Sequence, residues 1–245
     1  MLTHYESTQR GSVEVLHVPS DRPFAEMTSV ALAAASRRLT VYFDLDAPLP
    51  GVRAFLAPDR DAFDALVADV LKVEIERPSD PRRIAQPQRA DIVFLSPSAY
   101  ASQSAYAYVR EDYRRMVHHE LVHVVQEHLS PNIETSPFWW DEGLAVYISG
   151  QWRHESQFRF REPVIDAVQE GCLPSFADIE RDPALAYAFG WTLVRFIEQQ
   201  WGKAAIVDTV TQMGDGDVFA TLGRETLRVE RAWRAWGTRG DALRA

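Results

Sequence analysis

The sequence predicts an α+β protein with a mixed β-sheet in its first half and helices throughout its second half. Short runs of strand-forming residues are confined to the first half, and stretches with helical periodicity separate some of them. A long helix is expected near the middle of the chain, over Glu111–Leu129. Almost every apolar pattern beyond this helix repeats with helical spacing.

Length and composition indicate one domain built of two lobes. The chain has 245 residues, of which 46% are hydrophobic and 25% are charged, as in an ordinary soluble globular protein. We therefore expect a single domain over residues 1–245. Its sheet-containing lobe is expected over about residues 1–130, and its helical lobe over about residues 131–245.

The net charge and the composition of the amino terminus exclude some classes of partner and favour one cellular compartment. The net charge of −9 leaves no basic surplus to displace counterions from a nucleic acid, so no nucleic-acid partner is expected. No apolar run is as long as a membrane span, and the amino terminus has neither the basic start nor the apolar core of a signal peptide. The single cysteine, Cys172, fits a reducing compartment. These features predict a cytoplasmic protein without a membrane partner, and none of them indicates an oligomeric state.

Helical spacing of apolar residues and strand-like alternation predict the elements of the first half. A helix is expected over residues 63–71, where apolar positions recur with the spacing of one buried face, and Asp59 is its candidate cap. The alanine-rich segment Val30–Ser36 also favours a helix. Alternating small and aromatic residues in Ser104–Val109 predict a strand at the rim of the sheet, whereas the proline-rich segment 78–90 predicts a solvated loop. The other expected strands are Val13–Val18, Thr40–Leu45, Val52–Ala57 and Ile92–Leu95.

Start and stop signals define the helices of the second half. Acidic residues in its first turn suit the positive amino end of the helix Glu111–Leu129. The clearest helix has Asp182 as its cap, Pro183 at its first position and Gly202 as its terminator. A last helix is expected over Glu225–Trp236.

The central helix carries the sequence HELVH at positions 119–123. Residues four apart lie about 40° apart around an α-helix, so His119 and His123 project from one face and can share a metal ion. Glu120 lies about 60° to the other side of His123, close enough to bond a water molecule beside that ion without ligating it. Two neutral imidazoles hold Zn²⁺ while a neighbouring carboxylate takes the proton of the water. The motif therefore predicts one zinc ion per chain, with Glu120 as the general base.

A third protein ligand is expected, because catalytic zinc usually takes three and leaves the fourth position for water. The segment FWWDEGLAVY offers Asp141 and Glu142, and eighteen residues separate Glu142 from His123. HELVH followed at this distance by W-x-x-E-G-x-A-x-Y resembles the gluzincins, and specifically the peptidase MA-like proteins related to the aminopeptidase N group. The resemblance runs from Val13 to Trp236, most strongly in these two segments, and favours Glu142 over Asp141. It implies a zincin-like fold in which the active-site helix belongs to the sheet-containing lobe and an all-helical lobe carries the glutamate.

The resemblance also implies further site residues. Tyr187 lies in AYAFG, which is similar to an AY-x-x-(S/G) segment of the relatives, and is the candidate donor to the oxyanion, with Tyr147 and His154 as weaker alternatives. No G-x-M-E-N-type segment, which binds a free amino end in the aminopeptidase N group, precedes the metal helix. Aminopeptidase activity is accordingly not implied. Asp141 and Glu127 are candidates for orienting the histidines, because valine stands four positions after the glutamate, where thermolysin-like relatives have aspartate.

Several nearby residues have a structural interpretation beside a functional one. His118 faces about 100° away from the first ligand, which favours packing over ligation. His128 stands one residue too early for the third histidine of a metzincin, which favours a surface or core position. Trp139, Trp140 and Tyr147 are candidates for lining a substrate pocket, although helical spacing favours core packing for most tryptophans of this chain.

These observations predict a zinc-dependent metallopeptidase, an endopeptidase or oligopeptidase, whose partner is a peptide or protein substrate. In this prediction His119, His123 and Glu142 hold the zinc ion and Glu120 activates water. The alternative is a zincin-fold binding or regulatory module, either silent with a structural zinc ion or latent until a loop such as 78–90 moves. The glutamate of the motif favours the peptidase, because a structural zinc site has no use for a general base.

Overall fold

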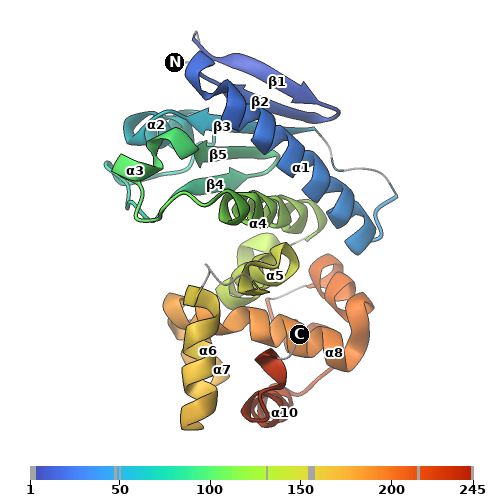
Figure 1. The fold of residues 1–245 in the computed structure, drawn as a ribbon. Helices are drawn as coiled ribbons and strands as arrows, with labels where there is room; N and C mark the ends of the chain where they lie inside the picture. Colours follow the sequence, from blue (N-terminus) through green and yellow to red (C-terminus); the bar gives the residue numbers. More distant parts are fainter. Residues whose placement is uncertain are drawn as a thin grey trace. The chain divides into compact units, whose positions relative to one another are not determined.

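One five-stranded mixed sheet organises the first part of the chain in the computed structural model (Figure 1). The strand order is β1-β2-β3-β5-β4. The inner strands β2, β3 and β5 run parallel, whereas β1 and β4 pair antiparallel to their neighbours at the two edges. The strands are β1 (Glu6–Arg10), β2 (Val13–His17), β3 (Val52–Ala57), β4 (Ala85–Gln88) and β5 (Asp91–Leu95).

The chain divides into two units, Met1–Val125 and Gln126–Ala245. The structure describes residues 4–46, 49, 51–130, 132–153, 158–213 and 216–243. Over these residues every strand lies in the first unit, and the second unit contains helices without strands. The α+β class and the mixed sheet expected from the sequence are therefore confirmed. None of the described helices is long and apolar enough to cross a membrane.

The burial pattern of two inner strands, β3 and β5, is the one typical of parallel strands. Residues Ile92–Leu95 of β5 and Ala54–Ala57 of β3 are buried without interruption. Strands of parallel sheets have this continuous apolar pattern because both of their faces are covered. In β2 the buried positions alternate with partly exposed ones, which is typical of a strand with one covered face.

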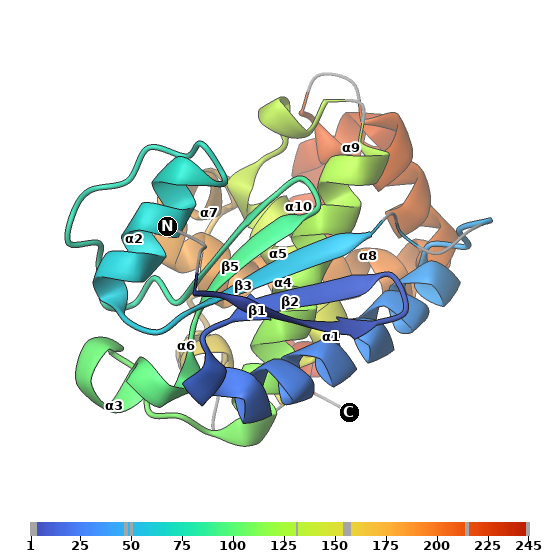
Figure 2. The same cartoon turned by 90° about the horizontal axis from the view of Figure 1, so that it is seen from above.

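Helices make the connections between the parallel strands. α1 (Arg22–Tyr42) joins β2 to β3 and lies along β1 and β2, as Figure 2 shows from above. α2 (Arg60–Asp69) follows β3 and contacts β3 and β5. Its cap is the one expected, because the Asp59 carboxylate accepts a hydrogen bond of 2.8 Å from the backbone N–H of Ala62. The remaining elements here are η1 (Pro19–Asp21), η2 (Pro97–Ala99), α3 (Tyr100–Gln103) and α4 (Arg110–Leu129).

Two predicted strands are wrong. Thr40–Leu45 is not a strand, because α1 continues to Tyr42 and the chain then turns through Asp44, whose φ is 52°. Ser104–Val109 forms no strand either. Its Tyr108 packs edge-on against other aromatic rings, at 6.0 Å from Phe24 and 5.9 Å from Tyr100 between ring centroids. The Tyr108 side chain thus packs this segment against α1 and α3.

The two edge strands, β1 and β4, were not predicted from the sequence. β1 has the polar sequence ESTQR, and β4 has AQPQ, so neither carries the apolar alternation of a strand. Part of the segment 78–90, expected as a solvated loop, therefore belongs to the sheet through the pairing of β4 with β5. Proline is tolerated in β4 because an edge strand has one side without ladder hydrogen bonds.

The helices of the second unit include the ones expected near the carboxyl end. α8 (Pro183–Gln212) starts at the Asp182 cap, which accepts from the Ala184 N–H at 2.8 Å. At Gly202 the backbone leaves the helical conformation, with φ 81° and ψ 170°, so the helix breaks where its end was expected and then resumes. The other elements are η3 (Ile133–Thr135), α5 (Phe138–Ser149), η4 (Gln151–Arg153), α6 (Phe158–Glu170), α7 (Phe176–Arg181), α9 (Val218–Thr221), α10 (Thr226–Thr238) and η6 (Asp241–Leu243).

α5 and α8 pack backbone to backbone through two glycines. A Cβ atom placed on Gly143 would lie 2.7 Å from the carbonyl oxygen and 2.9 Å from the Cα of Gly190. One placed on Gly190 would overlap the carbonyl oxygen of Trp139 and lie 3.1 Å from the Cα of Gly143. Neither position has room for a side chain. Because the obstacle is backbone, no change of rotamer can relieve the overlap.

We expect Gly190→Ala to lower the free energy of unfolding by at least about 2 kcal/mol, because α5 must move away from α8. Gly237→Ala is the matched control in α10. Its added methyl group meets the Cδ1 atom of Leu173 at 2.7 Å, the far end of a flexible side chain that can rotate away. Its expected change is within about 1 kcal/mol of zero. Urea denaturation of both variants is the measurement, and equal stability of the two would contradict the close contact.

Candidate metal centre

The histidine motif lies in a stretch of α4 that is buried on most sides. Val117 and Leu121, one turn apart, are fully buried. His119 and Glu120 are also buried, with 7% and 9% of their surface exposed, while His123 is half-buried. The motif is thus largely shielded from solvent.

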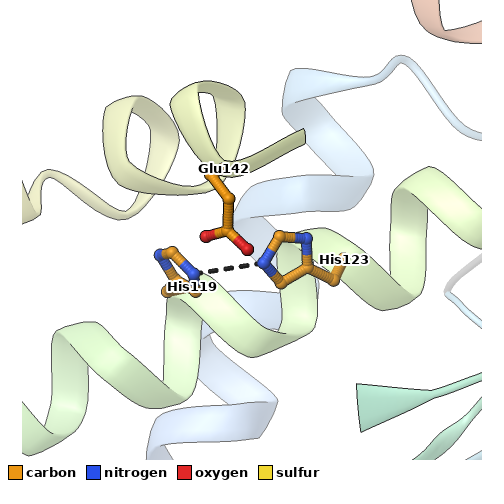
Figure 3. Close-up of side chains that lie close together, drawn as sticks. All are labelled: His119, His123 and Glu142. Atoms are coloured by element: carbon orange, nitrogen blue, oxygen red, sulfur yellow. Dashed lines mark hydrogen bonds between the residues drawn. The ribbon is translucent and has the colours of Figure 1, made fainter. Parts of the chain in front are cut away.

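The two histidine rings face each other across one turn of α4. Their Nε2 atoms are 3.1 Å apart, and their ring centroids are 4.8 Å apart at an interplanar angle of 78°. Glu142 of α5 joins them, and one ligand atom from each of the three residues lies within 4.8 Å of the others. Figure 3 shows its carboxylate directed toward the two imidazoles.

The donor set fits a zinc ion. Imidazole nitrogen and carboxylate oxygen bind zinc at about 2.0–2.2 Å, so two ligands of a tetrahedral ion stand roughly 3.3 Å apart. The histidine pair already has this separation, at 3.1 Å. Three protein ligands of this kind, with a carboxylate next to the first histidine, are typical of a catalytic rather than a structural zinc site.

Asp141, the other carboxylate considered as a ligand, makes hydrogen bonds within the second unit. Its Oδ1 atom accepts from the Ser136 hydroxyl at 2.5 Å and from the Gln126 amide at 3.2 Å. Gln126 is 1% exposed and stands one turn after the second histidine of the motif. Gln126 carries no signal in the sequence, because its importance depends on a contact with the start of α5. The bond holds the residue before Glu142 to the end of α4.

The candidate oxyanion donors have different surroundings. Tyr187 lies near the start of α8, is 39% exposed and packs edge-on against Phe138 of α5 at 5.3 Å between ring centroids. The hydroxyl of Tyr147 donates a hydrogen bond to Glu198, and burial together with this bond raises the Tyr147 pKa well above its usual range. His154 lies outside the described residues.

The Tyr147 ring also belongs to a stack of aromatic side chains inside the second unit. It lies parallel to Trp152 at 6.0 Å and 9°, and Trp152 lies parallel to Trp191 at 4.8 Å and 12°. The guanidinium group of Arg195 lies over the Trp152 ring at 4.6 Å. These contacts account for Tyr147 as a packing residue that joins α5, η4 and α8.

The two tryptophans before Glu142 are buried. Trp139 is 6% exposed and stacks on Phe219 at 5.8 Å, and Trp140 is 1% exposed. Their rings also meet each other edge-on at 5.9 Å. Core packing therefore accounts for both rings, and little of either surface is left for a substrate.

A comparison with protein families identifies the second half of the chain. Residues 104–238 match the peptidase MA superfamily. The chain belongs to the peptidase MA superfamily. No curated protein matches the sequence. The matched residues include α4 with its HELVH motif, α5 with Glu142, and α8.

Membership of the peptidase MA superfamily confirms the resemblance at that level. It supports a metallopeptidase-like protein, and zinc is the usual metal of this group of peptidases. The narrower relation to gluzincins and to the aminopeptidase N group stays a prediction. So do the roles of the individual site residues.

Two further histidines of α4, His118 and His128, lie in opposite environments. His128 is exposed, so of the surface or core position expected for it the structure shows the surface one. His118 is 8% exposed, and its Nε2 atom has no hydrogen-bond partner among the described residues. Burial, followed by the charges of Arg38, His119 and Arg115, lowers the His118 pKa to about 4. His118 is thus a neutral residue of the packed interior.

We expect Gln126→Ala to lower the free energy of unfolding by about 1–3 kcal/mol, because the partly buried Asp141 carboxylate loses a donor. The same change should weaken zinc binding, since α5 is held less firmly. Equilibrium denaturation and competition with a metal chelator measure the two effects. Asp141→Asn is the control, because its side-chain oxygen still accepts from Ser136 and Gln126. A larger loss for Asp141→Asn than for Gln126→Ala would contradict this account.

Stability should fall on acidification because of His118. Its folded-state pKa of about 4 lies below the ordinary value of 6.5, so between these pH values the unfolded chain binds a proton that the folded chain does not. The contribution is fully present above pH 6.5 and declines toward pH 4, by roughly 3 kcal/mol in total. Denaturation of chelator-treated protein across this range should show the slope. His118→Gln should flatten it, and the same substitution at the exposed His128 should not.

Proposed function

We propose that this peptidase MA protein is a zinc-dependent peptidase that cleaves internal bonds of peptides or proteins, as an endopeptidase or oligopeptidase. The observation that carries the proposal is the convergence of the ligand atoms of His119, His123 and Glu142 to within 4.8 Å. Glu120, on the same helix as the two histidines, adds the group that a hydrolase needs and a structural metal site does not.

The chain's own residues divide the work of hydrolysis. His119, His123 and Glu142 would hold a zinc ion here, and that ion would supply a Lewis acid that polarises the scissile carbonyl and acidifies water. Glu120 accepts the proton of the attacking water and passes it to the leaving amine, so that the amine departs neutral.

Tyr187 is our proposed donor to the developing oxyanion. Its place near the start of α8 leaves it partly exposed, as a group that contacts substrate must be. Tyr147 is less suited to this role, because its hydroxyl proton is already donated to Glu198. Its raised pKa also makes it a weaker donor.

The decisive experiment combines metal analysis with a peptide-library digest. Wild-type protein should carry about one zinc ion per chain and cleave peptides. Glu120→Gln should retain the metal and lose about 10²–10⁴-fold in kcat, because only proton transfer is removed. His119→Ala should lose the metal as well.

His128→Ala is the matched control, because this histidine lies on the same helix but is exposed. It should retain both the metal and the activity. Metal-loaded protein that cleaves no peptide would favour the binding or regulatory module instead. Undiminished turnover by Glu120→Gln would contradict the proposed mechanism.

A further inference from the structure

Two exposed aromatic rings lie together at the start of α5 and α8. Among the described residues, Phe138 and Tyr187 are the aromatic side chains classed as exposed, at 44% and 39%. They touch each other, with ring centroids 5.3 Å apart and planes at 80°. Single exposed apolar residues need no explanation, but a contiguous exposed aromatic pair often marks a binding site.

Helical spacing places this aromatic pair beside a candidate metal ligand. Phe138 and Glu142 are four residues apart on α5, so their side chains project from neighbouring positions on one face, with Cβ atoms about 5–6 Å apart. The contact of Gly143 with Gly190 fixes α5 against α8, which carries Tyr187. The pair is thus held in place by the same helix contact that positions the glutamate.

We propose that Phe138 and Tyr187 form a subsite for a large apolar or aromatic side chain of the peptide substrate, at a residue flanking the scissile bond. This inference rests on the proposed peptidase function. It names the class of substrate: peptides with phenylalanine, leucine or a similar residue next to the cleaved bond. The occupant is a single side chain, because the pair consists of two rings and Phe138 stands one helical turn from Glu142.

The geometry of the pair suits this occupant. In an edge-to-face pair the edge of one ring covers part of the other, and each ring keeps surface on its outer side. An apolar side chain placed there removes aromatic surface from water on both partners. Phe138 offers no polar atom, so charged and small side chains gain little from this subsite. The Tyr187 ring contributes to it independently of its hydroxyl group.

The alternative is that the pair only packs α5 against α8. Other contacts already provide that packing, since the helices meet at Gly143 and Gly190 and Trp139 and Trp140 are buried next to them. Phe138 also keeps 44% of its surface exposed. The pair therefore adds little to the helix interface and is better explained by a ligand.

The test uses two blocked peptides that differ only in having phenylalanine or alanine next to the bond that the wild-type protein cleaves best. Their dissociation constants are measured with zinc-loaded Glu120→Gln, in which binding is separated from turnover. We expect the phenylalanine peptide to bind about tenfold more tightly. Adding Phe138→Ala should bring the ratio close to one. If no bond is cleaved, the same comparison is made with peptides of random sequence around the varied residue.

Two controls separate the subsite from other effects. Tyr187→Phe keeps the ring and removes the hydroxyl, so the binding ratio should persist while turnover falls. Leu227→Ala changes a residue of α10 that is 64% exposed and should leave the ratio unaltered. A ratio near one in the parent protein, or one that Phe138→Ala does not change, overturns the subsite. Selective binding without any cleavage would instead reject the peptidase function and keep the subsite.

Discussion

The contact between Gly143 and Gly190 is the constraint on which the geometry of the helical unit depends. With no side chain between them, the separation of α5 and α8 is set by the van der Waals radii of backbone atoms. Glu142 precedes one of these glycines directly, and Tyr187 lies one turn before the other. The same helix contact thereby fixes the backbone positions of a candidate metal ligand and of an exposed aromatic residue. Such precision is what a site needs when its groups must be held to within a fraction of an ångström.

Hydrogen bonds also position α5, in addition to the contact between the two glycines. Gln126 and Ser136 both donate to Asp141, so the amino end of α5 is held to the end of α4 by the residue next to Glu142. Hydrogen bonds of this kind are worth little net energy when made, but leaving a partly buried carboxylate without them is costly. They therefore act mainly by specifying one arrangement of the two helices.

Local pattern was enough to predict much of the fold. The buried strands β2, β3 and β5, the cap of α2 and the breaking point of α8 at Gly202 all follow from short-range chemistry. The polar edge strands β1 and β4 could not be predicted, because pairing with a neighbour, and not their own residues, makes them strands. In the same way, helix periodicity brings His119 and His123 together. No local rule reaches across eighteen residues to Glu142, and only the family resemblance pointed to it. Gln126 and Phe138 depend on tertiary contacts and were missed.

The parallel stack of Trp152 and Trp191 has an optical consequence. Two indole rings held 4.8 Å apart and 12° from parallel sit in a rigid asymmetric environment, which gives strong near-ultraviolet circular dichroism. The other tryptophans of this unit contribute to the same signal, so it reports tertiary order in the helical unit as a whole, independently of helix content in the far ultraviolet. A state that keeps its helices but loosens their packing would lose the first signal and retain the second. Near-ultraviolet circular dichroism can therefore show whether the side chains inside the helical unit are tightly packed or mobile.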